Sequence, residues 1–593
     1  MKTVYFLATA IAILQIPLGN QAQAANSDSF DVKPAQVAAP MVLNDTEKKQ
    51  YIAILSAIKN AKWDEAERLL AAAPKGPMSA AARAEYYLAP GSPRIEAAQL
   101  EALLNEAPYL AQAEQLERMA IKRGVTASSE RPGTQKFSFL GSAPHRDFPE
   151  PVSAAGASEL RSQIQLFIKN DNPVSAEAAL LAKAGAISNA AQTELQYRIA
   201  WSYYIENDDN NAQRMASQSR QGQGEWAVYG HWVHALASWR LKNTNEAFNS
   251  FDAVTRNANN DDLRAASLYW SARAAMAIGK PQLVQQRLQN AAKLPETFYG
   301  LLASETLGME PIAKRQARNS TLNWNAIKGE KNAQIAVGFS QIGENKLADE
   351  AIRFQARIGN ARNHKDLAQL AGALNLPTTQ LWLGHYGPSN GQADALARYP
   401  MPNWKPSTGW RIDPALAFAH TLQESAFRTD VISSAGARGL MQVRPGTAGD
   451  MARERGTSFS ASDLDRPSVN LEYGQSYIEK LRDSNEVTGG LLPKVIAAYN
   501  AGPTPIARWN AEIRDNGDPL LYMESIPYWE TRGYVTTILR NYWIYEIREG
   551  KNGGSMMGLA QYLWPKFPTK NGSLAVRADG SPRSTKGDTF AAR

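Results

Sequence analysis

The sequence predicts an all-α protein built in several parts, and three observations support this fold class. The chain has 593 residues, which is too long for one hydrophobic core and favours three or four domains or a repeat array. From about residue 45 to about residue 307 it is alanine-rich, with apolar residues at helical spacing and frequent breaks. The apolar fraction of 44% and the charged fraction of 20% are those of an ordinary globular protein.

Residues 45–324 are expected to form a curved α-solenoid, that is, an α-superhelical domain of stacked helix pairs. Trp201, Trp239 and Trp270 each lie on an alanine-lined segment, and they are 38 and 31 residues apart. This irregular spacing is typical of degenerate helix-pair repeats rather than of a strict repeat array. Small residues would let paired helices approach closely, and the aromatic side chains would fill the gaps between pairs.

The remaining boundaries follow changes in composition. Prolines and glycines interrupt the helical pattern at 125–152, which predicts a long loop that is either functional or disordered. Several short helical segments over 325–391 predict a helical linker domain. A last module over 392–569 follows, and the polar segment 570–593 is expected to be a disordered tail.

The N-terminal segment has the features of a secretory signal peptide. A lysine precedes an apolar run that ends near Leu18, and small residues at 22–24 supply a cleavage site. We expect a signal peptide over 1–24 and a flexible leader over 25–44; the alternative is a buried N-terminal helix. No other segment approaches the roughly 18 uncharged apolar residues that a membrane span needs.

Charge and cysteine usage narrow the possible partners and sites. The chain has no cysteine, so we expect no cysteine-linked lipid anchor, no disulfide and no thiolate metal site. The formal net charge of +7 suits an acidic partner. Nucleic acid is one such partner, but export argues against it; cell-wall peptides and anionic envelope polymers are others. Basic charge alone does not decide between them.

The last module contains one carboxylic acid suited to catalysis, Glu424. Asp413-Pro414 predicts a helix start, with the aspartate as cap and the proline in the first turn. Glu424 lies near the C-terminal end of this helix, where the dipole disfavours negative charge, and its apolar neighbours Leu422 and Phe427 desolvate it. Both effects raise the pKa of a carboxyl, as a general acid near neutral pH requires. A lone glutamate is more often a solvated surface acid, so the accompanying motifs matter.

Three motifs accompany Glu424. The glycine-rich turn at 435–442 permits close backbone approach to a ligand, or is simply a tight turn between helices. Tyr499-Asn500, near the end of a short apolar helix, would put a phenol and an amide beside a cleft, or is a helix C-cap with a packed tyrosine. Glu530, near the start of a long helix, is favoured there by the dipole whether or not it functions, and an ion pair with Arg532 is the alternative.

In this order and spacing the four pieces resemble the lysozyme-like catalytic module of the Slt-type soluble lytic transglycosylases, which cut the glycan strands of bacterial cell wall. The upstream region is similar to that family in length, composition and the Phe298-Tyr299-Gly300 junction. The resemblance implies that Glu424 is the sole catalytic acid and base. Arg444 departs from the family pattern, in which a methionine is expected. The residues that fall at the family's sugar subsites are Ser433, Met441, Gln442, Tyr499, Asn500 and Glu530.

The resemblance also implies a reaction. Glu424 would protonate the β-1,4 glycosidic oxygen between N-acetylmuramic acid and N-acetylglucosamine, and the muramoyl N-acetyl carbonyl would stabilise the sugar cation. Glu424 would then deprotonate the C6 hydroxyl of the same sugar, which closes a 1,6-anhydro ring. Most glycosidases use two carboxylates instead. No cofactor is implied, and six scattered histidines without cysteine predict no metal site.

Two other functions stay open at this point. A muramidase would hydrolyse the same bond on the same scaffold, and a non-catalytic envelope protein would bind glycan through the solenoid. The resemblance implies a periplasmic protein whose partners are peptidoglycan glycan strands, with other cell-wall enzymes as further candidates. The solenoid is expected to guide strands to the cleft.

Overall fold

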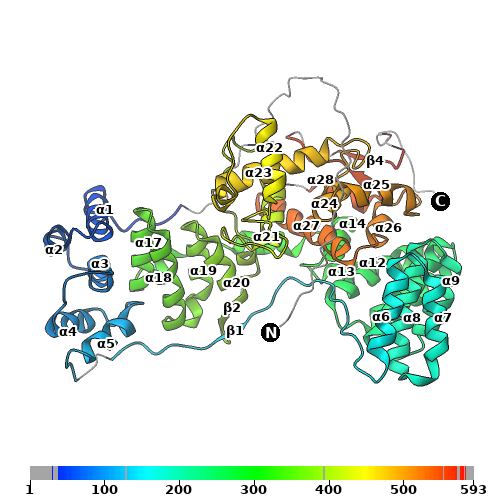
Figure 1. The fold of residues 1–593 in the computed structure, drawn as a ribbon, viewed down its shortest axis with the longest axis horizontal. Helices are drawn as coiled ribbons and strands as arrows, with labels where there is room; N and C mark the ends of the chain where they lie inside the picture. The colour runs from blue at the N-terminus through cyan, green and yellow to red at the C-terminus, as the bar shows by residue number, and fades with distance from the viewer. Residues whose placement is uncertain are drawn as a thin grey trace. The chain divides into compact units, whose positions relative to one another are not determined.

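The computed structural model describes residue 30 and residues 38–126, 130–391, 394–551, 553–570, 574–579 and 581. These residues form 28 α-helices and four short strands, so the predicted all-α class is confirmed (Figure 1). Their contacts divide the chain into two compact units. One unit takes the described residues of Lys33–Ser142 and Gln316–Trp404, and the other takes residue 30 and the described residues of Ala143–Arg315 and Lys405–Arg593.

The first unit consists of short helices around one alanine- and leucine-rich core. Helices α17 and α18 pack as a pair, α19 and α20 pack as another, and α3 contacts α17. The strands β1 (Phe137–Phe139) and β2 (Tyr386–Pro388) pair antiparallel, with Phe137 opposite Pro388. The helices are α1 (Asp45–Lys59), α2 (Trp63–Ala71), α3 (Pro77–Leu88), α4 (Ala97–Glu106), α5 (Ala113–Ile121), α16 (Trp324–Ile327), α17 (Lys331–Gln341), α18 (Asn345–Ile358), α19 (His364–Ala373) and α20 (Pro377–His385), and α15 (Ile312–Asn319) lies at the boundary between the units.

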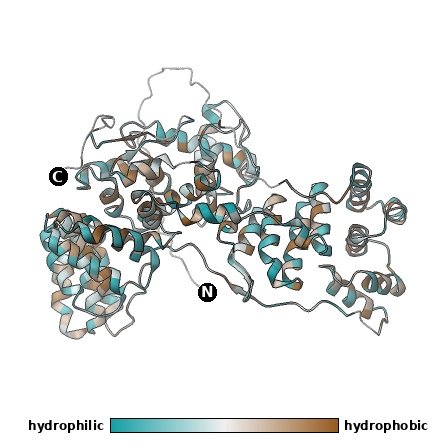
Figure 2. Cartoon of the chain, turned by 180° about the vertical axis from the view of Figure 1, so that it is seen from behind, coloured by the Kyte–Doolittle hydropathy of each residue, from teal (hydrophilic) through white to brown (hydrophobic). Residues whose placement is uncertain are grey.

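The second unit begins with an array of helices in which each packs on the next along the chain. Trp239 and Trp270 meet edge to face at 5.8 Å between ring centroids, and Phe251 stacks on Trp270. Aromatic rings thus fill the space between neighbouring helices, as the sequence predicts. Figure 2 shows polar and apolar residues intermixed along these helices, and residues on all sides of α10 and α12 are buried. The array comprises α6 (Ala157–Lys169), α7 (Pro173–Lys183), α8 (Asn189–Ile205), α9 (Asp209–Ser219), α10 (Glu225–Arg240), α11 (Thr244–Asn257), α12 (Asp261–Ala277), α13 (Val284–Ala292) and α14 (Phe298–Thr306).

The rest of this unit is a second helical group in which α21 and α24 both pack against α27. The last array helix, α14, also contacts α27 and α28, and the Phe298 ring stacks on Trp543 at 4.9 Å. The array and this group therefore share buried surface. The elements are α21 (Pro414–Ser425), α22 (Pro445–Glu454), α23 (Pro467–Arg482), α24 (Leu492–Ala501), α25 (Pro503–Glu512), α26 (Pro519–Glu524), α27 (Trp529–Arg548), α28 (Gly554–Ala560), β3 (Trp564–Pro565) and β4 (Ala575–Val576).

A helix-free stretch, here called the strap (residues 143–152), joins the array to the second helical group. Its backbone carbonyls accept hydrogen bonds from side chains of both. The Arg146 guanidinium lies 2.9 Å from Glu524 of α26 and 3.3 Å from Asp262 of α12. The prolines of the predicted loop leave carbonyls unpaired within the loop, and helix side chains satisfy them. The donors to the strap carbonyls are Arg540, Asn260, Tyr229, Trp226 and Arg161.

The ends of the chain bear differently on the sequence predictions. The predicted signal peptide and most of the predicted leader lie outside the described residues. The predicted disordered tail contains one ordered piece, because Ala575–Val576 pairs antiparallel with Trp564–Pro565 and Lys566 donates its amide to Leu574. The other predicted domain boundaries stay predictions. In the described part of the chain no helix is long and apolar enough to cross a membrane.

Candidate active site

Helix α21 presents Glu424 one residue before its last residue, Ser425. Asp413 caps the start of the helix with its carboxylate, as predicted, and Pro414 occupies the first turn. The helix stops abruptly because Ala426 and Phe427 take left-handed backbone angles, with φ of 51° and 62°. Consecutive non-glycine residues in this region are strained, and such strain collects at functional sites.

The Glu424 carboxyl accepts a hydrogen bond from the long helix α27. The Tyr534 hydroxyl donates to Glu424 Oε1 at 2.5 Å, and His420 Nδ1 lies 2.8 Å from the same hydroxyl oxygen. Burial raises the pKa of Glu424 to about 7; the Tyr534 hydrogen bond acts against this rise and the nearby charge of Glu530 adds to it. Burial also lowers the pKa of His420 to about 3, so its ring is neutral at physiological pH. The site therefore holds a carboxylic acid that gains or loses its proton near neutral pH.

The glycine-rich turn folds back beside this acid through paired backbone groups. Arg438 and Val443 exchange hydrogen bonds, and the Gly439 amide donates to the Val431 carbonyl. Gly439 has φ of +70°, and a Cβ there would lie 2.3 Å from both the Asn470 amide and the Leu464 carbonyl. The sequence allows this glycine to admit a ligand or to form a tight turn. The structure uses it for close packing against α23.

The predicted subsite residues on the turn are placed as follows. Met441 is fully buried, its amide donates to Asn470, and its side chain packs against Gly474, so Met441 offers no exposed side chain to a ligand. Gln442 has φ of 48° and its amide nitrogen donates to the carbonyls of Val431 and Gly439. Ser433 accepts from the Ala437 amide at the head of the turn.

The other predicted subsite residues come from α24 and α27. The Tyr499 hydroxyl donates to the Met441 carbonyl at 2.8 Å, which ties α24 to the turn. Its ring lies 4.6 Å from that of His420, and the charge of Glu424 acts on its hydroxyl. Asn500 accepts from the Thr531 hydroxyl at 2.6 Å. Glu530 is exposed in the first turn of α27.

Arg444 is exposed at the start of α22, directly after the turn. Its positive charge acts on the Tyr477 hydroxyl, and the Tyr477 ring lies 5.5 Å from that of Tyr499. The rings of Tyr477 and Tyr499 thus lie between the Arg444 cation and Glu424.

Sequence reasoning missed Tyr534 and His420. Each has a simple positional signal: His420 precedes Glu424 by one helical turn, and Tyr534 follows Glu530 by one helical turn. A pattern centred on carboxylates overlooks both, because a buried tyrosine and a buried histidine look like core residues. Arg532, the alternative partner for Glu530, instead donates to the Ile526 carbonyl and lies over the Trp201 ring at 3.8 Å.

A second acid with a raised pKa lies elsewhere in the same group. Burial raises the pKa of Glu546 to about 8, and the charge of Asp413 adds to the effect. Glu546 shares its surroundings with Glu549 and Lys551 at the far end of α27, not with the turn or with Tyr499. A raised pKa alone therefore does not identify the site, and the accompanying groups do.

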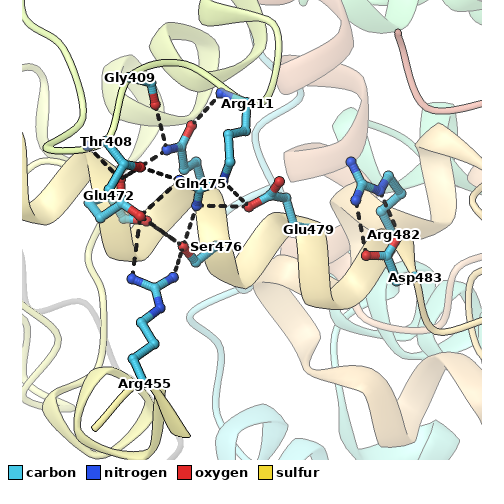
Figure 3. A network of polar contacts seen from close by, with 10 residues as sticks. All are labelled: Thr408, Gly409, Arg411, Arg455, Glu472, Gln475, Ser476, Glu479, Arg482 and Asp483. Carbon is cyan, nitrogen blue, oxygen red and sulfur yellow. Dashed lines mark hydrogen bonds and ion pairs between the residues drawn. The ribbon is translucent and has the colours of Figure 1, made fainter. Parts of the chain in front are cut away.

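A polar network holds the segment before α21 on α23 (Figure 3). Glu472 accepts from the Thr408 hydroxyl at 2.7 Å and from Arg411 at 3.0 Å, and Arg411 also donates to Glu479. Because this segment leads directly into the α21 cap, the network fixes the helix that presents Glu424. In the described residues no group of three or more histidine, aspartate or glutamate side chains is arranged to hold a metal ion.

Comparisons with known proteins find a family match over the segment that holds Glu424. Residues 402–520 match the family described as the transglycosylase SLT domain, a segment that contains Glu424 and the turn but ends before Tyr534. The chain is 29% identical over 290 residues to the soluble lytic murein transglycosylase of Salmonella typhimurium, covering 46% of this chain and 42% of the relative. It is 36% identical over 139 residues to the Escherichia coli K12 protein of that name, covering 22% of this chain and 20% of the relative.

Solved structures of similar overall extent exist. The 70 kDa soluble lytic transglycosylase of Escherichia coli aligns with a TM-score of 0.49 and 17% identity, covering 86% of this chain and 98% of that one. The lytic transglycosylase Slt of Pseudomonas aeruginosa aligns with a TM-score of 0.48 and 20% identity, covering 85% of this chain and 81% of that one. The matched segments span less than half the length of these curated sequence relatives. Residues 402–520 thus match the transglycosylase SLT domain, and the chain is similar to the soluble lytic murein transglycosylases.

Proposed function

We propose that this protein is a lytic transglycosylase of peptidoglycan, with Glu424 as the general acid and then the general base. The observation that supports this proposal most directly is a carboxyl with a pKa of about 7, bonded to Tyr534 and lying in an SLT domain. An acid of that pKa is protonated in a large fraction of molecules at neutral pH, and its conjugate base accepts a proton under the same conditions. One group can therefore serve both halves of the reaction.

In the first step Glu424 protonates the oxygen between N-acetylmuramic acid and N-acetylglucosamine. The muramoyl N-acetyl carbonyl stabilises the resulting sugar cation, so the protein needs no nucleophile. In the second step the Glu424 carboxylate removes the proton of the C6 hydroxyl, and that oxygen bonds to C1 to give a 1,6-anhydro end. The proton that left Glu424 in the first step is thus replaced in the second.

The subsites follow from the same proposal. Glu530 and Tyr499 interact electrostatically with Glu424. Together with Gln442 and Asn500 they are proposed to supply carboxylate, phenol and amide groups that suit sugar hydroxyls. The array is proposed to guide glycan strands towards the cleft, and we propose export to the periplasm by a cleaved signal peptide. Guidance predicts that KM falls as strands are lengthened beyond the span of the cleft.

Hydrolysis of the same bond is the second candidate. It is favoured by Glu530, the described carboxylate whose charge acts on Glu424. A muramidase using both acids would activate water with one of them. A glycan-binding scaffold without activity is a third reading, and it leaves the raised pKa of Glu424 without a purpose.

Mass spectrometry of products from purified peptidoglycan separates these functions. The proposal expects muramoyl ends lighter by one water and resistant to borohydride. Reducible muramoyl ends would establish hydrolysis, and the absence of any fragments would leave the scaffold reading. E424Q should lose activity by roughly a hundredfold or more. E546Q is the matched control, since it replaces a buried acid of similarly raised pKa outside the cleft and should stay active.

A further inference from the structure

Three side chains form a hydrogen-bonded row that ends at the acid. His420 and Glu424 lie one helical turn apart on α21, and Tyr534 of α27 lies between their polar atoms. The distances are 2.8 Å from His420 Nδ1 to the Tyr534 hydroxyl and 2.5 Å from that hydroxyl to Glu424 Oε1. His420 is 1% exposed and Tyr534 is 5% exposed, so water does not compete for these contacts.

The hydrogen bonds of this row can run in two directions, because the single hydroxyl proton of Tyr534 is donated either to Glu424 or to His420. In one direction Tyr534 donates to Glu424 Oε1, and its oxygen accepts from a protonated His420 Nδ1. The neutral Glu424 then has to carry its own proton on the other oxygen, Oε2. In the reverse direction Glu424 donates from Oε1 to Tyr534, and Tyr534 donates to an unprotonated His420 Nδ1. The acid proton would then be held inside the protein.

We infer that His420 is a positioning residue that sets the first direction: it donates from Nδ1 to Tyr534 and so keeps the transferable proton of Glu424 on Oε2. This inference rests on the proposed function of Glu424. A neutral histidine with its proton on Nδ1 has no acceptor to offer at that atom, so the reverse direction is blocked. The same donation makes Tyr534 a stronger donor to the carboxylate that forms after the first step.

The surroundings of the acid support a role for this row. Burial favours the neutral carboxyl, and only Tyr534 donates a described hydrogen bond that favours the charged form. Tyr499 faces the acid from α24, but its proton goes to the Met441 carbonyl. Weakening the hydrogen bond from Tyr534 should therefore raise the pKa of Glu424 further. The groups whose charges or hydroxyls face the acid are Glu530 and Tyr534 of α27 and Tyr499 of α24, with Tyr477 of α23 and Arg444 of α22 behind them.

Two variants of His420 test the inference in the full chain. In H420N the amide nitrogen can take the place of Nδ1 and donate to Tyr534. In H420Q the amide lies one bond further out, where it cannot reach the hydroxyl in the same way. We expect H420N to keep kcat within about threefold of wild type on purified peptidoglycan, and H420Q to lose on the order of tenfold or more in kcat, with little change in KM. The basic limb of the kcat/KM profile should move to higher pH in H420Q only.

A double-mutant cycle with Y534F separates positioning from a general structural effect. If His420 acts through Tyr534, then H420Q adds little to the loss already caused by Y534F, because the row is broken in both. Additive losses, or equal activity and pH profiles for H420N and H420Q, would overturn the inference. Wild type that releases no peptidoglycan fragments would instead refute the proposed function. Thermal unfolding of each variant checks that it is folded, and H420N alone still tests the donor if H420Q is not.

Discussion

At the residue scale, the buried carboxyl of Glu424 makes the stability of the fold depend on pH. Its pKa is raised from 4.5 to about 7 because burial penalises the charged form. A carboxyl whose folded pKa lies above its unfolded value contributes its full stability below the unfolded pKa. That contribution is lost as pH rises between 4.5 and 7. At alkaline pH the native state therefore holds a charge that it would bury more easily as a neutral group.

The E424Q variant should accordingly be more stable than wild type at pH 8 and similar to it at pH 4. We expect a gain of about 1–2 kcal/mol at pH 8, discounted because the side chain is only partly buried. Glutamine keeps an oxygen that accepts from Tyr534, so the hydrogen bond is retained. Urea unfolding at the two pH values measures this difference. The argument fails if the stability of E424Q relative to wild type does not depend on pH.

The same pKa predicts how activity depends on pH. In the proposed mechanism the free enzyme must hold the Glu424 proton to act, so kcat/KM should fall above about pH 7 with the slope of a single group. Histidine protonation is not expected to limit the acid side, since burial lowers the pKa of His420 to about 3. Initial rates of peptidoglycan solubilisation from pH 4 to pH 9 provide the profile. A rate that does not fall by pH 9 would assign the essential proton to another group.

At the scale of elements, the glycine-rich turn depends on one glycine for its packing and on another for its backbone angle. Both Gly436 and Gly439 have positive φ, at +77° and +70°, so alanine is strained at either position. A Cβ at Gly436 meets nothing within 4 Å, whereas one at Gly439 meets Asn470 and Leu464 at 2.3 Å. The two positions thus form a natural pair for comparison.

We expect G436A to lower the free energy of unfolding by about 1 kcal/mol, the cost of the left-handed angle alone. G439A should cost about 3 kcal/mol or more, because backbone and α23 must also move. It should also reduce activity, since Gln442 donates to the Gly439 carbonyl. Chemical denaturation and the peptidoglycan assay measure both effects. Equal losses in the two variants would show that packing at Gly439 is unimportant.

The network on α23 makes a pH-dependent contribution of the opposite sign to that of Glu424. Burial alone would raise the pKa of Glu472, but the hydrogen bond from Thr408 and the charge of Arg411 outweigh it and hold the pKa below its usual value of 4.5. A depressed pKa gives stability that is present above the unfolded value and is lost as pH falls through the folded one.

E472Q should therefore lower the free energy of unfolding by about 2–3 kcal/mol at pH 7, and by less as pH falls below 4. E454Q serves as control, because Glu454 is 59% exposed in its ion pair with Lys480 and should change stability by under about 0.5 kcal/mol. Thermal unfolding at pH 3.5 and pH 7 tests the pair. A cost for E472Q that is the same at both pH values would contradict the assignment of charge to this network.

The elements also show what the sequence could predict and what it could not. The Asp413 cap, the short helix Leu492–Ala501 and the start of the long helix near Glu530 follow from local signals and agree with the structure. Those signals lie within one or two turns of the chain. The bond from Tyr534 to Glu424 spans 110 residues, and no periodicity indicates it. The ordered pair at Ala575–Val576 was likewise hidden, because its partner strand has only two residues.

At the scale of the molecule, the strap links the helical array to the second helical group through polar contacts. Arg146 lies within 2.9 Å of Glu524, and the Tyr299 hydroxyl donates to the same carboxylate at 2.8 Å. Glu524 is 1% exposed, so its carboxylate oxygens are held by these side chains. Two residues of the Phe298-Tyr299-Gly300 junction thus connect the array to the second helical group. Phe298 packs on α27, and Tyr299 donates a hydrogen bond to Glu524 of α26.

Replacing Arg146 by methionine should leave two carboxylates buried without their cation. We expect R146M to cost about 3–5 kcal/mol in unfolding free energy, and to separate the melting of the array from that of the SLT domain. R453M, in an ion pair whose side chains are 79% and 60% exposed, should cost under about 0.5 kcal/mol. Calorimetry distinguishes one transition from two. A single unshifted transition in R146M would show that the strap is not needed to join the parts.

The contacts of the strap also depend on the order in which the chain is synthesised. Arg146 and Glu524 are 378 residues apart, so the cation is made long before its partner leaves the ribosome. Glu424 likewise gains its hydrogen bond only after Tyr534, which lies 110 residues further along the chain, has been synthesised. A chain truncated before residue 524 thus lacks both the ion pair between Arg146 and Glu524 and the hydrogen bond from Tyr534 to Glu424. Both contacts are therefore in place only after the segment through Tyr534 has been synthesised.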